Sequence, residues 1–108
     1  YPERWPMNGA RVDFPALRSM TFFEPDRGKF RCLDLAYDAL SLGGTAPAVL
    51  NAANEMAVSA FLQRRISFEK IPVIIERALS LHKTRPSPNL QDIIEADRQA
   101  RAFVETLL

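Results

Sequence analysis

The chain has 108 residues, of which 47% are hydrophobic and 25% are charged, and its formal net charge is +1. This length suits one globular domain and leaves no room for a large core together with a large substrate cleft. The balance of 14 basic and 13 acidic residues argues against a nucleic-acid partner, which requires a clustered basic face. No apolar run approaches the ~20 residues that span a bilayer, so no membrane partner is expected.

Single copies of cysteine and histidine exclude several kinds of site. Cys32 cannot form an internal disulfide, which favours an intracellular protein. His82 lies much later in the chain, so a Cys–His dyad or a zinc site is a poor interpretation. The opening YPERWP is neither a signal peptide nor a start at methionine, and we expect the chain to be part of a longer protein.

Residues 1–29 are predicted to form an extended linker or arm. Four prolines interrupt any helical period here, because proline fixes φ and removes a backbone donor. At most one short strand is expected, at Ser19–Glu24, in a Thr/Phe-rich run. A freely solvated linker would not carry eight large apolar residues, so we expect the arm to lie against its own bundle or against the rest of a parent protein. These residues are Trp5, Met7, Val12, Phe14, Leu17, Met20, Phe22 and Phe23.

Residues 30–108 are predicted to form a small, mainly α bundle of four to five helices. The first helix is expected over Arg31–Leu42, ended by Gly43 and Gly44. Its buried stripe is predicted to be Leu33, Ala36, Tyr37 and Leu40.

The second helix is expected to follow Thr45, a plausible N-cap, and to reach Leu62. Pro72 marks the first turn of a third helix, which ends near Leu81. The stripes predicted to be buried on these two helices are Val49, Ala53, Met56, Ala57, Ala60 and Phe61, and then Ile71, Ile74, Ile75, Ala78 and Leu79.

The last helical region is expected to begin after Asn89, a good N-cap with Asp92 three residues on. Leu90, Ile93 and Ile94 are predicted to lead its apolar face. Asp97 is a second potential cap, which would make residues 98–108 a separate segment.

Three polar residues interrupt the alanine-rich helix expected after Thr45. At about 100° per residue, Asn51 shares a face with Asn54 and with Glu55, beside the apolar stripe of that helix. A polar group buried without a partner costs roughly 1–3 kcal/mol. We therefore expect Asn51, Asn54 and Glu55 to form a structural polar joint that ties this helix to the arm or to its neighbours. The alternative is that they line a ligand cleft.

No other pattern indicates chemistry. Asp34 and Asp38 lie one helical turn apart, but hard-cation sites gather several oxygen ligands, and a solvated charged face is the better interpretation. Gly43-Gly44-Thr45 precedes a helix as a phosphate-binding turn does, but it lacks the preceding strand and a basic residue. We expect no catalytic, cofactor-binding or metal-binding residue in this chain.

A resemblance to a known family rests on three segments, ARVDFPALRSMTFFEPD, GGTAPAVLNAANEMAVSAFL and IIEADRQAR. In this order they closely resemble the carboxy-terminal part of the 1-deoxy-D-xylulose 5-phosphate reductoisomerases. The resemblance covers the whole chain, arm and bundle, and about the last quarter of the family's length. It implies that an NADPH-binding domain and a central domain that binds Mg²⁺ or Mn²⁺ are the missing partners. It also implies a homodimeric parent enzyme in the bacterial cytoplasm or in a plastid.

The resemblance implies a parent enzyme that converts 1-deoxy-D-xylulose 5-phosphate to 2-C-methyl-D-erythritol 4-phosphate in isoprenoid precursor synthesis. This piece would bind no cofactor itself and would be structural support, inactive alone. An autonomous helical interaction module, with the arm as its docking segment, is the alternative. A small-molecule binder that uses the rim formed by Asn51, Asn54 and Glu55 is a third interpretation.

Overall fold

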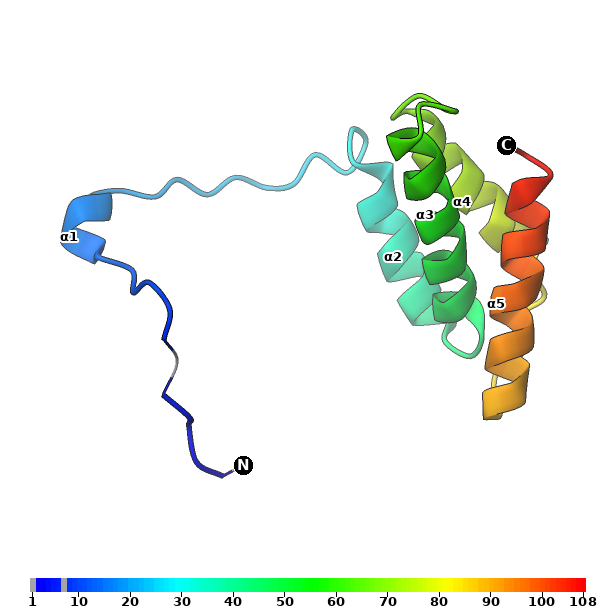
Figure 1. Cartoon of the computed structure of the whole chain (residues 1–108), viewed down its shortest axis with the longest axis horizontal. Helices are drawn as coiled ribbons and strands as arrows, with labels where there is room; N and C mark the ends of the chain where they lie inside the picture. Colours follow the sequence, from blue (N-terminus) through cyan, green and yellow to red (C-terminus); the bar gives the residue numbers. More distant parts are fainter. Residues whose placement is uncertain (1, 7) are drawn as a thin grey trace.

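The computed structural model describes residues 2–6 and 8–108, which form five helices and, within these ranges, no strand (Figure 1). One single-turn helix, α1 (Phe14–Leu17), lies in the arm. The bundle consists of α2 (Arg31–Leu42), α3 (Ala46–Leu62), α4 (Lys70–Leu81) and α5 (Leu90–Glu105). The expected mainly α fold is confirmed, and the helix boundaries expected from glycine, proline and Asn89 agree with the structure.

The arm extends away from the bundle, and all of its described residues are exposed (Figure 1). The strand expected at Ser19–Glu24 does not form, because no neighbouring strand completes a ladder of hydrogen bonds. The α1 turn was not expected. The carboxylate of Asp13 caps it by accepting from the backbone N–H of Ala16 at 3.2 Å, and Pro15 lies in its first turn. Met7, counted above among the apolar residues, lies outside the described residues.

Helix α3 is the centre of the bundle and packs against α2, α4 and α5. It meets them with alanines that are fully buried, so the helix axes can approach closely. Larger side chains such as Leu35, Ile75 and Val104 fill the space around it. The stripes predicted for α3 and α4 are buried or partly buried against this core. The buried alanines of α3 are Ala46, Ala52, Ala53, Ala57 and Ala60.

The buried face predicted for α2 is wrong. Leu35 and Ala39 are the buried residues of this helix, whereas Tyr37 is 52% exposed and Leu40 is 72% exposed. The reason is that α2 carries apolar residues on two faces and lies at the edge of the bundle, where only one face meets other helices.

Helix α5 is continuous, so the second cap expected at Asp97 is also wrong. The Asp97 carboxylate accepts hydrogen bonds from Arg101 one turn on instead of capping a new helix. The apolar face is also displaced from the prediction, because Ala96, Ala100 and Val104 are buried while Leu90 and Ile94 are exposed. The first turns of α5 project past the connection between α2 and α3, which leaves their apolar residues uncovered (Figure 1).

Candidate functional site

The predicted joint lies on the side of α3 that faces α5. Glu55 Oε2 lies 2.6 Å from Nη2 of Arg101 on α5, and Asn51 Nδ2 donates to Glu55 Oε1 at 3.1 Å. Arg101 Nε also donates to Asp97 Oδ2 at 2.8 Å. The structure thus brings Asn51 and Glu55 together with a partner on another helix. Asn54 is half-buried and its side chain makes no hydrogen bond to another described residue.

The electrostatics of this cluster follow from its hydrogen bonds. The bond from Arg101, and then the bond from Asn51, lower the pKa of the Glu55 carboxyl below its ordinary value. The carboxylates of Asp97 and Glu55 raise the pKa of Arg101. Both partners of the Glu55–Arg101 pair are partly exposed, and exposed ion pairs contribute little to stability. The cluster therefore fixes how α3 and α5 are aligned more than how strongly they hold together.

The sequence-based interpretation missed a second polar joint, at Thr45. This threonine is 2% exposed and is the only polar residue among the buried ones that the structure describes. Its Oγ1 lies 2.7 Å from Nε2 of His82 and accepts the backbone N–H of Arg85 at 3.1 Å. Its own N–H donates to the carbonyl of Arg85 at 3.2 Å. Three hydrogen bonds thus connect the α2–α3 turn to the segment that follows α4.

Thr45 does not cap α3 through its side chain, which corrects the expectation above. Its backbone has helical angles, φ −86° and ψ −7°, whereas a capping residue takes an extended conformation that aims its side chain at the first turn. The hydroxyl instead points across to His82 and Arg85. The signal in the sequence was the pair Gly43-Gly44 directly before a threonine, which allows the turn to come close to another segment.

Gly44 shows how close that approach is. Its φ is +54°, and a Cβ placed on it would overlap the carbonyl oxygen of Arg85. Gly43 also has a positive φ, +64°, but no atom lies near its missing Cβ. Gly43 is therefore required by its backbone conformation alone. Gly44 is required by its conformation and by its contact with Arg85.

The environment of His82 favours the neutral imidazole. Partial burial lowers the pKa of the ring. The Thr45 hydroxyl accepts the N–H of Arg85 and still has a proton and a second lone pair, so it can donate to Nε2 or accept from it, as the tautomer of the ring decides. The ring is engaged in holding the fold and is not poised as a free general base.

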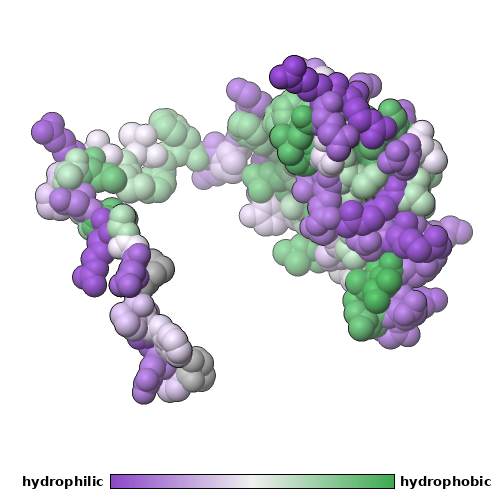
Figure 2. Space-filling model, viewed as in Figure 1, coloured by the Kyte–Doolittle hydropathy of each residue, from purple (hydrophilic) through white to green (hydrophobic). Residues whose placement is uncertain are grey.

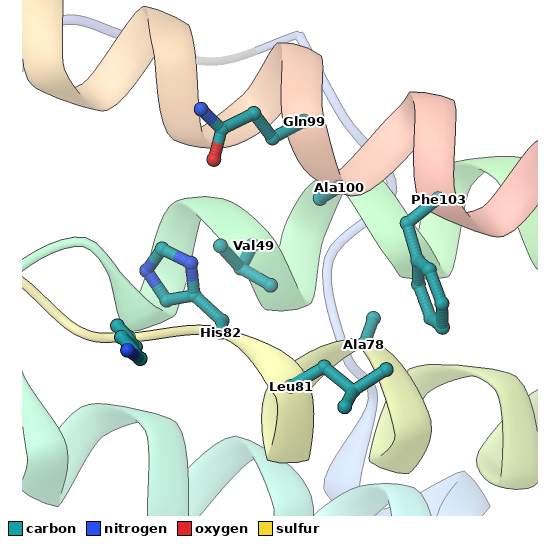
Figure 3. A pocket seen from close by; sticks show the side chains of 8 residues that line it. Val49, Ala78, Leu81, His82, Gln99, Ala100 and Phe103 are labelled. Atoms are coloured by element: carbon teal, nitrogen blue, oxygen red, sulfur yellow. The ribbon is translucent and has the colours of Figure 1, made fainter.

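A half-open pocket of about 400 Å³ lies between α3, α4 and α5 beside this joint (Figure 3). Its inner wall is apolar, with Val49, Ala100 and Phe103, and His82 and Gln99 stand at its polar edge (Figure 3). No group of three or more potential metal-ligating side chains occurs in residues 2–6 and 8–108. The apolar inner wall gives the pocket the features of a packing gap between the three helices.

Helices long and apolar enough to cross a membrane do not occur in the described part of the chain.

A four-helix bundle preceded by an extended arm with exposed apolar residues places the chain in the class of small helical domains. The chain matches the family described as the DXP reductoisomerase C-terminal domain over residues 1–103. It belongs to this family.

Named relatives agree with this assignment. The 1-deoxy-D-xylulose 5-phosphate reductoisomerase of Acetivibrio thermocellus is 48% identical over 108 residues, which are 100% of this chain and 28% of that protein. The enzyme of Halothermothrix orenii is 51% identical over 102 residues, or 94% of this chain and 27% of that protein. The solved structure of the Zymomonas mobilis reductoisomerase in complex with NADPH has a TM-score of 0.88 at 38% identity, and the match covers 99% of this chain and 28% of that one. The chain thus spans little more than a quarter of the length of its relatives.

Proposed function

We propose that this chain is the carboxy-terminal support domain of a 1-deoxy-D-xylulose 5-phosphate reductoisomerase and takes no direct part in the reaction. The observation that carries the proposal is full coverage of this chain together with 28% coverage of relatives that bear this name. The parent enzyme would convert 1-deoxy-D-xylulose 5-phosphate to 2-C-methyl-D-erythritol 4-phosphate with NADPH and Mg²⁺ or Mn²⁺. We also propose that it is a homodimer of the bacterial cytoplasm or of a plastid.

The residues present do not fit a metal or nicotinamide site. More than half of the acidic residues are engaged in surface ion pairs or helix caps, and in the described part of the chain no three acidic, histidine or cysteine side chains converge. The only histidine is held by Thr45. We therefore assign cofactor binding and chemistry to the parts of the parent that precede this chain, and we derive no reaction step from its residues.

The arm supports the view that this chain is held by a larger body. The solved relative covers 99% of the chain at a TM-score of 0.88. Residues 30–108 make up less than three quarters of the chain, so superposition of the bundle alone could not reach this score. The arm therefore follows a similar extended path in a protein more than three times as long. Exposed apolar residues such as Trp5 and Phe23 would be covered there.

Turnover measurements test the proposal. The isolated 108 residues, given substrate, NADPH and Mg²⁺, should oxidise no NADPH, whereas the full-length parent should oxidise it at a normal rate. Turnover by the isolated chain would overturn the assignment of chemistry to other domains. A full-length parent that is folded but inactive on this substrate would overturn the assignment of the enzyme.

An autonomous interaction module remains the second candidate, because the arm exposes several large apolar residues. Intact mass spectrometry of the protein purified from its natural source separates the two. A chain of about 12.2 kDa would favour the module, and a chain several times heavier would favour the enzyme. Hydrogen exchange of the arm adds a check on its role, since strong protection in the isolated chain would contradict a missing covering surface.

A further inference from the structure

Helix α2 has two apolar faces on opposite sides. At about 100° per residue, Leu33, Tyr37 and Leu40 fall within a sector of roughly 60°, and Leu35 lies about 160° away from Leu33. Leu35 and Ala39 form the inner face, which is buried against the bundle. The outer face is defined here by Phe30, Leu33, Ala36, Tyr37 and Leu40.

Most of the outer face is exposed in the structure, and Leu33 is half-buried. Phe30 is 54% exposed, Tyr37 52% and Leu40 72%, and hydrophobic residues gather on the side of the bundle where the arm joins it (Figure 2). A helix that is apolar on opposite sides is typical of one buried between two layers. The bundle supplies only one of these layers, through α3 and α4.

Charged residues border the outer face and cover only its two aromatic rings, since Lys29 Nζ lies 5.8 Å from the centre of the Phe30 ring. The guanidinium of Arg27 lies 5.2 Å from the centre of the Tyr37 ring and pairs with Asp34 at 3.1 Å. Arg31 pairs with Glu76 at 2.6 Å. An apolar centre with a rim of satisfied charges has the composition of an interface core and its edge.

We propose that the outer face of α2 is the docking surface for the preceding part of the same polypeptide. This inference rests on the proposed function, because it requires a parent protein. More than two thirds of each relative's length lies outside this chain. The arm enters the bundle at Phe30, on the outer face itself, so a body that holds the arm lies next to this face (Figure 1). Most of the chain's own arm leads away from the bundle, and only its last residues, Arg27 and Lys29, touch the outer face, so the arm leaves the rest of this face uncovered (Figure 1).

Thiol labelling of the full-length parent tests the proposal without reference to turnover. In a Cys32→Ser background, Leu40→Cys places a thiol on the outer face. Leu62→Cys is the matched control, because Leu62 is 73% exposed and also lies in the last turn of its helix, α3. Labelling with a maleimide is followed by mass spectrometry of the peptide that contains each new cysteine, and each native rate is divided by the rate in urea.

The expected result is that the thiol at position 40 reacts at least about tenfold more slowly than the thiol at position 62, since access controls the modification of thiols of similar pKa. Adding Tyr37→Ser should raise the rate at position 40 and leave the rate at position 62 unchanged. Equal, fast rates at both positions in an active parent would overturn the proposal and leave the proposed function intact. Equal, slow rates would show that the shielding is not specific to the outer face of α2, which also overturns the proposal. Loss of shielding on dilution to the monomer would assign the face to a second copy, which also overturns the proposal.

Discussion

Thr45 Oγ1 and His82 Nε2 lie 2.7 Å apart, although 37 positions separate the two residues in the chain. The contact joins the turn before α3 to the segment after α4, and Arg85 adds two backbone hydrogen bonds to the same threonine. A buried threonine with two hydrogen bonds to its hydroxyl and one from its backbone N–H is a strong constraint on the geometry of the two connections, because these groups would be left unsatisfied if the segments separated.

Replacing Thr45 with valine should destabilise the bundle by about 1–3 kcal/mol, because the N–H of Arg85 and Nε2 of His82 lose their partner without a change of volume. Thr45→Ser keeps the hydroxyl, so its stability should fall much less than that of the valine variant. Urea unfolding of the 108-residue chain, followed by circular dichroism, measures the difference. Equal losses for the two variants would show that the methyl group matters and the hydrogen bonds do not.

Alanine at Gly44 should be far more damaging than alanine at Gly43. Both positions have positive φ, which costs a non-glycine residue about 1–2 kcal/mol. Only at Gly44 does the new Cβ also overlap the carbonyl of Arg85. The loss of stability in Gly44→Ala should therefore exceed that in Gly43→Ala by more than about 2 kcal/mol. Similar thermal midpoints for Gly43→Ala and Gly44→Ala would contradict the close approach of the two segments.

Mild acid should weaken the bundle through His82. Burial lowers the pKa of the native imidazole below its ordinary 6.5, so the unfolded chain binds the proton more readily. The stability contributed by neutral His82 is complete above about pH 6.5 and is lost as the pH falls toward the native pKa. Glu55 has a lowered pKa, so its contribution is lost only at a pH below its ordinary 4.5.

Urea midpoints measured between about pH 7.5 and pH 5 test this effect, since the chain has one histidine. The midpoint should fall with pH in the natural sequence. His82→Asn should be less stable at neutral pH but nearly independent of pH over this range. An unchanged slope in His82→Asn would assign the pH dependence to another group.

The Glu55–Arg101 pair should behave as a surface contact that depends on salt. Arg101→Met should lower the unfolding midpoint more than Glu55→Gln, because Arg101 also binds Asp97. A double-mutant cycle of the two changes should give a favourable coupling at low salt that shrinks in about 1 M NaCl, where charges are screened within about 3 Å. No coupling at low salt would show that Glu55 does not join α3 to α5.

Local signals were sufficient to predict where α2 ends and where α5 begins. Asn89 accepts the backbone N–H of Asp92 at 2.9 Å, and Asp92 accepts that of Asn89 at 3.0 Å, as the spacing of these residues predicts for a helix start. Gly43 ends α2 with a positive φ, as a glycine after a helix commonly does. These effects involve neighbours in the chain and are readable without the fold.

Local signals did not predict which helix faces are buried or which residues pair between distant segments. Periodicity shows that α2 has an apolar stripe at Tyr37 and Leu40, but it cannot say whether the bundle or another body covers it. The polar character of Glu55 was apparent, whereas its partner, Arg101, is 46 positions away. The contact between Gly44 and Arg85 likewise depends on how two connections meet after the helices have packed.

The buried alanines of α3 set an unusual limit on how this domain can be improved. Ala52, Ala53 and Ala57 have no exposed surface, and three helices close on them. An added methylene group there would push backbones apart at a cost of about 1–3 kcal/mol. Engineering that enlarges core side chains is therefore unsuitable along α3. In a library selected for thermal resistance, α3 should retain its small side chains, and the stabilising substitutions should lie elsewhere in the chain.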